Sequence, residues 1–318
     1  MSKPFASSGD TAPKTETLEA IGDGIWALTA EGDPNVGAIE GEDFIVAFEA
    51  RATPLMARRW LRKLREHTDK PVKYLVLSHY HAVRVLGAAA FDAEVIVASA
   101  ETQRLITERG KEDWEVEFGR MPRLFDGHEE IPGLTWPTLT FEKHYSIDLG
   151  GDRGTVELSW LGNGHTSGDI VAYIPSEKVL FAGDLVENGS AVYTGDAYHR
   201  DWATGTLDKV AVLDVEVLVG GRGQIAHTKA ESRRAIELTR DFVSRLFTTV
   251  EKVKNAGGTI KDAYRAAREE LLPDYGGMPV FEHAIVFDTK RAWEELDGQR
   301  PAIWTPDRDR VVWSQLTE

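Results

Sequence analysis

The sequence predicts a mixed α/β fold, and three observations lead to this prediction. The chain has 318 residues, of which 42% are hydrophobic and 28% charged, an ordinary globular composition with enough length for a substantial core. Short apolar runs bounded by turn residues, as in strands, alternate with longer stretches in which apolar residues recur at helical spacing. This alternation occurs twice along the chain, and beyond residue 228 the helical spacing continues without strands.

The first half is expected to form one sheet with helices beside it. Apolar runs separated by Gly and Asp predict strands over 24–28, 36–39 and 44–48. Residues 52–67 change to helical spacing, with apolar side chains on one stripe and Arg and Lys opposite. The next predicted elements are strands over 73–77 and 95–98 and a helix over 101–109. The stretch 112–139, which carries Trp, Pro and Gly, is predicted to be a loop or insertion, and such long loops are often functional.

The second half repeats the pattern. Strands are expected over 155–160, 170–174 and 178–181, because these apolar runs are joined by short turns that contain Gly, Asp or Pro. A helix over 201–213 and a strand over 215–219 complete this half. Together the two halves predict two sheets.

Three helices are predicted to close the chain, over 229–255, about 260–272 and about 281–297. The first of them keeps its apolar side chains at helical spacing until the pair Gly257-Gly258 ends it.

These patterns divide the chain into three parts. Residues 1–15, rich in Ser, Thr, Pro and Lys, are predicted to be a flexible tail. Residues 16–228 form the main domain, and residues 229–318 form a helical extension packed on the same domain. The extension has more apolar surface than one core needs, so it could cover a site or form a homodimer.

Charge and composition exclude several classes of protein. Lys and Arg number 37 and Asp and Glu 52, and the net charge of −15 repels phosphate backbones and anionic lipid surfaces. We therefore expect a small-molecule substrate and neither nucleic acid nor membrane as a partner. There is no cysteine, so any metal must be held by His and carboxylates. No apolar run suits a signal peptide or a membrane span, which predicts a cytoplasmic protein.

Two histidines stand directly after a predicted strand. His79 and His81 are two residues apart, and positions i and i+2 of an extended chain share a face, so both rings can approach one cation. A pair of surface or capping histidines is equally compatible with this motif taken by itself.

Two further elements carry residues suited to a metal site. His165 is at the centre of the Gly-rich segment 161–169, where the glycines allow a close approach to a site. Asp184 ends a strongly apolar strand, where its carboxylate needs a cation, a hydrogen-bond donor or water. Each element has an ordinary structural alternative, a hairpin turn for the first and a turn or helix cap for the second.

In this order, the motifs HxH, GHTxGD and GD resemble the metallo-β-lactamase superfamily over about residues 18–225. The resemblance implies a four-layer αβ/βα sandwich, two sheets face to face with helices outside, here with extra C-terminal helices. It also implies a metal site at one edge between the halves. The implied metal ligands are His79, His81 and His165, with Asp184 as the carboxylate that usually bridges two metal ions.

The sequence departs from the family pattern at the second metal site. The pattern is HxHxDH, but Val83 and Arg84 stand at its last two positions, and Arg222 replaces the His of a Gly-His-Gly turn. Glu49 stands where the family has an early Asp. Fixed guanidinium groups repel a second divalent cation and can pair with Asp184. We therefore expect a mononuclear site with one Zn²⁺ per chain, which suits three imidazoles plus water, and Fe²⁺ is the alternative.

The resemblance and this chemistry predict a metal-dependent hydrolase of a small ester, lactone, thioester or amide. Zinc lowers the pKa of bound water from about 15.7 to about 7, which supplies hydroxide at neutral pH. Asp184 is the expected catalytic residue, which orients the hydroxide or accepts its proton. Arg84 and Arg222 are candidate substrate-binding residues, although salt bridges to Asp184 or Glu49 would explain them equally well. His199 is a third candidate, with an exposed loop position as its alternative.

Two other functions stay open. The superfamily includes mononuclear iron persulfide dioxygenases, whose iron is held by two His and one Asp, and His79, His165 and Asp184 could supply that set. A non-catalytic descendant that binds a ligand is the second alternative. Bound iron with oxygen consumption would favour the first, and protein without any metal would favour the second. A β-lactamase is disfavoured, because no export signal is found.

Overall fold

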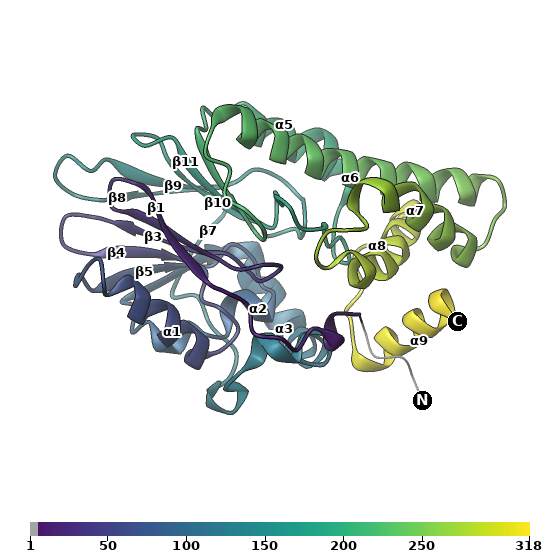
Figure 1. Cartoon of the computed structure of the whole chain (residues 1–318), viewed down its shortest axis with the longest axis horizontal. Helices are drawn as coiled ribbons and strands as arrows, with labels where there is room; N and C mark the ends of the chain where they lie inside the picture. The colour runs from purple at the N-terminus through teal and green to yellow at the C-terminus, as the bar shows by residue number, and fades with distance from the viewer. Residues whose placement is uncertain (1–5) are drawn as a thin grey trace.

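The computed structural model describes residues 6–318, and two β-sheets stacked face to face form its centre, with helices on both outer faces (Figure 1). The larger sheet has seven strands. From one edge to the other they are β1 (Thr17–Gly22), β2 (Ile25–Thr29), β3 (Val36–Glu40), β4 (Ile45–Phe48), β5 (Val72–Val76), β6 (Val95–Ser99) and β7 (Leu139–Phe141). Strands β1 to β4 pair antiparallel, and β4 to β7 pair parallel.

The smaller sheet has five strands. In order they are β12 (Val217–Gly220), β11 (Val179–Gly183), β10 (Ile170–Ile174), β9 (Thr155–Trp160) and β8 (His144–Asp148). Strands β8 to β11 pair antiparallel, whereas β11 and β12 are parallel. Each sheet therefore contains neighbouring parallel strands whose carboxyl ends can contribute side chains to one site.

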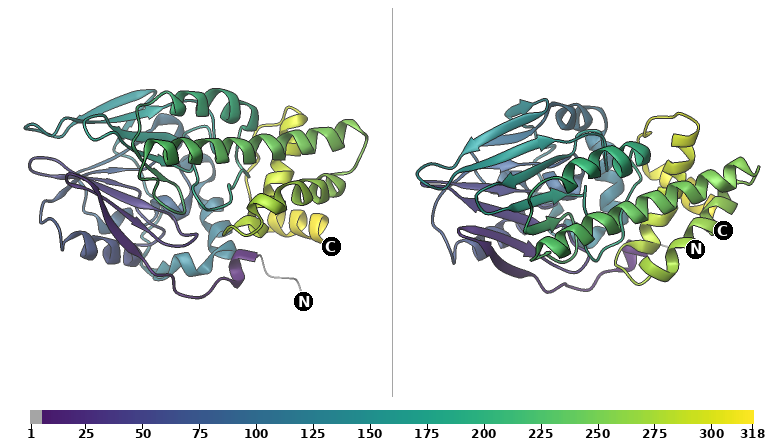
Figure 2. Two further views of the ribbon diagram at one scale, coloured as in Figure 1. Left: turned by 45° about the horizontal axis from the view of Figure 1, so that its top comes forward. Right: turned by 90° about the horizontal axis from the view of Figure 1, so that it is seen from above.

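The helices form the outer layers and a bundle at one end of the sandwich. The helices are α1 (Pro54–Leu64), α2 (Ala82–Val85), α3 (Ala100–Arg120), α4 (His199–Asp201), α5 (Leu207–Ala211), α6 (Lys229–Asn255), α7 (Ile260–Tyr275), α8 (Phe281–Leu296) and α9 (Pro306–Thr317). Shorter helical turns are η1 (Ala6–Gly9), η2 (Ala88–Ala90), η3 (Pro122–Phe125), η4 (His128–Glu130) and the π-helical η5 (Trp202–Thr206). Helix α6 continues past the sheets, and α7 and α8 pack beside it (Figure 2).

Buried apolar side chains form separate layers on the two faces of the larger sheet. In β4, Val46 packs between the sheets, whereas the next residue, Ala47, packs on the opposite face with Trp60 of α1. Successive side chains of a strand point to opposite faces, so β4 is buried on both sides. The sheets approach closely at Gly37, where a Cβ atom would lie 2.1 Å from the ring of Phe181. A glycine is therefore required there for the two halves to meet.

The predicted fold class is confirmed, since the chain has a mixed α/β fold with two sheets and extra C-terminal helices. Helix α6 has the predicted bounds. The predicted loop over 112–139 was wrong at its start, because α3 continues to Arg120. The last turns of α3 bury Asp113 and Glu117 as well as Arg120, so its buried face lacks the apolar spacing that marks a helix. Strands β1, β7 and β8 and helices α2 and α9 were not predicted.

The N-terminal turn η1 and the C-terminal helix α9 both pack against other helices of the protein. Residues 1–5 of the predicted flexible tail lie outside the described residues, and η1 contacts α3 and α8. The division into 16–228 and 229–318 stays a prediction. Within residues 6–318, no helix combines the length and the apolar content that a membrane crossing needs.

Candidate metal centre

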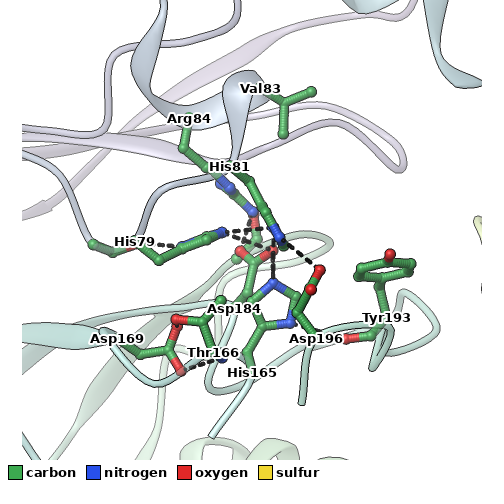
Figure 3. Close-up of polar contacts among 12 residues, drawn as sticks. His79, His81, Val83, Arg84, His165, Thr166, Asp169, Asp184, Tyr193 and Asp196 are labelled. Carbon is green, nitrogen blue, oxygen red and sulfur yellow. Dashed lines mark hydrogen bonds and ion pairs between the residues drawn. The ribbon is translucent and has the colours of Figure 1, made fainter. Parts of the chain in front are cut away.

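Three histidines and one aspartate from both sheets meet at one edge of the sandwich (Figure 3). His79 and His81 follow β5, His165 is in the loop between β9 and β10, and Asp184 follows β11. Each of these residues is buried, and each offers one ligand atom within 4.8 Å of the others. The structure thus brings together the four residues that the sequence predicts as metal ligands.

The inner ring nitrogens have the separations that a small cation requires. The Nδ1 atom of His81 is 3.2 Å from Nε2 of His79 and 3.1 Å from Nε2 of His165. Zinc–nitrogen bonds of about 2.0–2.1 Å in a tetrahedron place two ligand nitrogens about 3.3 Å apart. The Oδ2 atom of Asp184 is farther out, 3.8 Å from Nε2 of His79 and 3.6 Å from Nε2 of His165. The three imidazoles therefore match a tetrahedral ion more closely than the carboxylate does.

The outer nitrogen of each ring has a hydrogen-bond acceptor. The Nδ1 atom of His165 donates to the carbonyl oxygen of Tyr193 (2.9 Å), and Nε2 of His81 donates to Oδ2 of Asp196 (3.3 Å). The Nδ1 atom of His79 is 2.8 Å from the hydroxyl of Ser78, which itself donates to the buried Glu49. In the neutral form of each ring, these acceptors select the tautomer whose inner nitrogen carries a free lone pair.

The electrostatics of the cluster favour a positive charge at its centre. Burial lowers the pKa of His165 to about 3 and that of His79 well below its usual value, so both rings are neutral. Burial also lowers the pKa of His81, but the nearby carboxylates, Asp113 foremost, outweigh it and raise that pKa to about 9. In the absence of a metal one ring thus holds a proton, and a divalent cation can replace that charge. The donor set and its charge therefore fit a metal ion.

Guanidinium groups lie beside Asp184, from the two positions where the sequence departs from the expected second-site histidines. Arg84 donates to Oδ1 of Asp184 and to the carbonyl oxygen of Gly221 (2.8 Å), and Nη1 of Arg222 lies 3.2 Å from Oδ2 of Asp184. Burial raises the pKa of Asp184, but the charge of Arg84 and its neighbours holds it well below its usual range. Val83 is buried and apolar. Asp184 is therefore an ionised partner of two permanent cations.

Glu49 is buried next to this edge but does not reach the cluster. Its carboxylate accepts hydrogen bonds from Ser78, and burial raises its pKa to about 7. Its backbone has a φ of 68°, in the left-handed region that side chains other than glycine rarely adopt. Such local strain is typical of functional sites and here directs a carboxyl group at the hydroxyl beside His79.

A narrow cavity of about 10 Å³, enough for about one water molecule, adjoins the cluster. It is lined by His81, Glu117, Arg120, Met121, Asp184, Tyr193, Arg222, Val280 and His283. Arg222 reaches this cavity, whereas Arg84 is fully buried and is not part of its lining. A second, larger cavity shares three of these residues and extends to the N-terminal segment near Lys14, so the two cavities are neighbours.

Other candidates lie elsewhere. His199 is buried, with Nδ1 2.9 Å from Glu295 and Nε2 2.9 Å from the hydroxyl of Thr194, and it does not line the cavity. Its expected exposed position was therefore wrong, and its position offers no support for a substrate contact. Asp196 and Tyr193, which position two of the rings, were not predicted from the sequence, because neither residue is part of a recognisable motif.

Comparison with known proteins places the motifs in a wider context. A sequence model described as the metallo-beta-lactamase superfamily matches residues 47–222, more than half of the chain. The chain is 28% identical over 225 residues to 2,4-dinitroanisole O-demethylase subunit alpha of Nocardioides sp. (strain JS1661), a match that covers 70% of this chain and 60% of that protein. It is 22% identical to the linear primary-alkylsulfatase of Pseudomonas sp. (strain ATCC 19151), over 70% of this chain and 47% of that protein. The chain thus spans about half to three fifths of these two relatives.

Solved structures show the same fold. The mono-zinc form of the metallo-beta-lactamase FIM-1 from Pseudomonas aeruginosa has a TM-score of 0.54 and 21% identity, covering 72% of this chain and 95% of that chain. A double mutant of the sec-alkyl sulfatase PisA1 has a TM-score of 0.69 and 16% identity, covering 90% of this chain and 51% of that chain. Because the second match covers 90% of this chain, it includes at least part of the C-terminal helical region, residues 229–318. With the motifs, the two-sheet sandwich and the sequence match in agreement, the chain belongs to the metallo-beta-lactamase superfamily.

Proposed function

We propose that this protein is a hydrolase that uses one divalent metal ion per chain, with zinc as the first choice, and that it cleaves a small ester, lactone, thioester or amide. The observation that carries the proposal is the convergence of three inner ring nitrogens beside two arginines that pair with Asp184. Such a donor set holds one cation, and the guanidinium charges oppose a second.

His79, His81 and His165 would hold the ion, and a zinc ion there would supply the Lewis acidity that makes water nucleophilic near neutral pH. The ionised Asp184 is a weak base, because Arg84 and Arg222 lower its pKa. Its carboxylate is therefore better suited to orient the attacking water, by accepting a hydrogen bond, than to remove the proton.

The two arginines have different proposed roles. Arg84 is sealed from the cavity and keeps Asp184 ionised and fixed. Arg222 lines the cavity, and its buried Nε atom has no hydrogen-bond partner among the described residues. A buried donor without a partner is costly, so an acceptor atom of the substrate, such as the developing oxyanion, would be bound there.

The relatives support bond cleavage as the type of reaction. Their names describe a β-lactamase, an alkylsulfatase and an O-demethylase, three activities on different groups. The persulfide dioxygenase alternative is less well supported, because the inner nitrogen of His81 lies within 3.2 Å of those of both His79 and His165. That alternative would need only two histidines and would leave the third without a role.

Elemental analysis of protein purified without added metal, combined with hydrolysis assays on esters, lactones, thioesters and amides, tests the proposal. We expect one zinc ion per chain and hydrolysis of at least one substrate class, both lost on chelation and restored by zinc. Oxygen uptake on a persulfide by an iron-loaded protein would overturn the proposal in favour of the dioxygenase. Protein that neither contains nor is stabilised by zinc would overturn it in favour of a ligand-binding descendant.

A further inference from the structure

A line of buried contacts joins the C-terminal helix to the cavity beside the metal centre. Asp309, in the first turn of α9, accepts two hydrogen bonds from Arg120, the last residue of α3, at 2.6 and 2.8 Å. Arg120 also donates from Nη1 to the hydroxyl oxygen of Tyr193 at 2.9 Å. Its guanidinium group lies 3.9 Å from the ring centre of Phe287 in α8. Two hydrogen bonds to one carboxylate and the contact with an aromatic ring hold the guanidinium group of Arg120 in one position.

This contact determines which way the hydroxyl of Tyr193 can donate. A guanidinium group has donors and no acceptor, so Arg120 occupies an acceptor position on the phenol oxygen. The phenol hydrogen must therefore point to another atom, and within residues 6–318 that hydroxyl has no second hydrogen-bond partner. Tyr193 and Arg120 both line the cavity that His81 and Asp184 also line. A ligand atom in this cavity is the available acceptor.

Tyr193 also contacts the metal centre, through its backbone carbonyl oxygen and not through its hydroxyl. The carbonyl oxygen of Tyr193 accepts the hydrogen bond from Nδ1 of His165, whereas its hydroxyl is held by Arg120. The aromatic ring centre is 5.9 Å from that of His165 and 6.0 Å from that of His81. Removal of the hydroxyl alone therefore leaves the contact to His165 intact.

We propose that Tyr193 is a catalytic residue that donates its phenol proton to the leaving oxygen of the substrate, with Arg120 and Asp309 as positioning residues. This inference rests on the proposed hydrolase function. The oxygen of the attacking water forms a bond to the acyl carbon, and the bond from that carbon to the leaving oxygen breaks. The phenol proton moves to the leaving oxygen, and Arg120 stabilises the phenolate. The proton released by the attacking water then restores the phenol, so that one water is consumed in all.

The proposal narrows the substrate class. A thiolate leaves readily without a proton, because thiols have a pKa near 8.5, whereas an alkoxide is a much stronger base and needs a proton donor. A phenol at the leaving-group position thus suits oxygen esters and lactones of aliphatic alcohols better than thioesters. We therefore assign the site to substrates with an alcohol leaving group.

The test compares two esters of one acid, an alkyl ester and a nitrophenyl ester, in the zinc-loaded protein. For Tyr193→Phe we expect kcat on the alkyl ester to fall about 100-fold, which is the lower end of the range for a lost general acid. On the nitrophenyl ester we expect kcat to fall only about 10-fold. Zinc content stays at one per chain, because the carbonyl to His165 remains. Arg120→Lys keeps a cation near the phenol, so we expect its kcat on the alkyl ester to fall less than that of Tyr193→Phe. Tyr173→Phe, which removes a hydroxyl that bonds only the remote carbonyl of Asp214, is the control with unchanged rates.

Each outcome bears on one proposal. Equal losses by Tyr193→Phe on both esters, or no loss on either, overturn the role of Tyr193 while the hydrolase proposal stands. A drop in zinc content of that variant also overturns it, because Tyr193 would then act through His165. A zinc-loaded wild-type protein that cleaves no ester, lactone, thioester or amide overturns the hydrolase proposal itself.

Discussion

The two sides of Asp184 differ in the charge that they offer to its carboxylate. On one side, His79 and His165 are neutral and direct lone pairs inward, so this side needs a cation. On the other side, Arg84 and Arg222 bring permanent positive charge, so this side repels one. Burial is similar on both sides, and the difference therefore comes from side-chain chemistry. One carboxylate thus faces a group of neutral ring donors on one side and permanent cations on the other.

The largest expected effect comes from the histidine side. His165→Ala removes one of three ring ligands, and we expect metal affinity to fall by more than about 100-fold, beyond the range for loss of an outer hydrogen-bond partner. Elemental analysis and zinc titration measure the loss. His144→Ala, on the exposed edge strand β8, is the matched control and keeps one zinc per chain. Full metal content in His165→Ala would show that this side is not the binding side.

The arginine side can be converted. The triple variant Val83→Asp, Arg84→His, Arg222→His restores the ligands of the family pattern, and we expect its metal content to rise from one to two per chain. The single variant Val83→Asp serves as the control and keeps one. Two metal ions in the unmodified protein would refute the view that guanidinium groups replace the second ion.

Loss of one arginine should cost stability without adding a metal. Arg84→Met leaves the buried Asp184 short of a partner, and breaking a buried ion pair in this way costs about 3–5 kcal/mol. Chemical denaturation of the metal-free protein measures the change. Arg104→Met, which breaks exposed pairs with Glu101 and Glu108 on α3, is expected to cost less than about 1 kcal/mol. Equal costs for the two variants would contradict the assigned role of Arg84.

The smallest expected effect is the change of zinc affinity with pH. The pKa of His81 is raised to about 9 in the metal-free protein, so its ring holds a proton at pH 7 that a metal must displace. Zinc affinity is expected to rise about tenfold per pH unit from 7 to 9, about 100-fold in all, and to level off above 9. In the metal-free protein the sign is opposite: the stability contributed by His81 is complete below about pH 6.5 and is lost as the pH rises through 9. Zinc titrations at pH 7, 8 and 9 check this slope, and a flat profile would contradict it.

The sequence predicted the parts of the site that follow strands. His79, His81, His165 and Asp184 stand directly after apolar runs or in Gly-rich turns, where local patterns identify them. The wall of the cavity could not be predicted in this way. Arg120 obtains its role from Asp309, 189 residues later, and neither has a motif. The missing part of α3 has the same cause, because the face that it turns to the site is charged and breaks the apolar spacing.

The donors of the metal centre come from both sheets, since His79 and His81 follow the larger one and His165 and Asp184 the smaller one. An ion bound by His79 and His81 of one layer and His165 of the other would cross-link the two layers, in addition to the apolar contact at Gly37 and Phe181. Occupancy of the centre is thereby linked to folding, because only the assembled sandwich presents a complete ligand set. Tighter metal binding would accordingly also make the two sheets of this protein harder to separate.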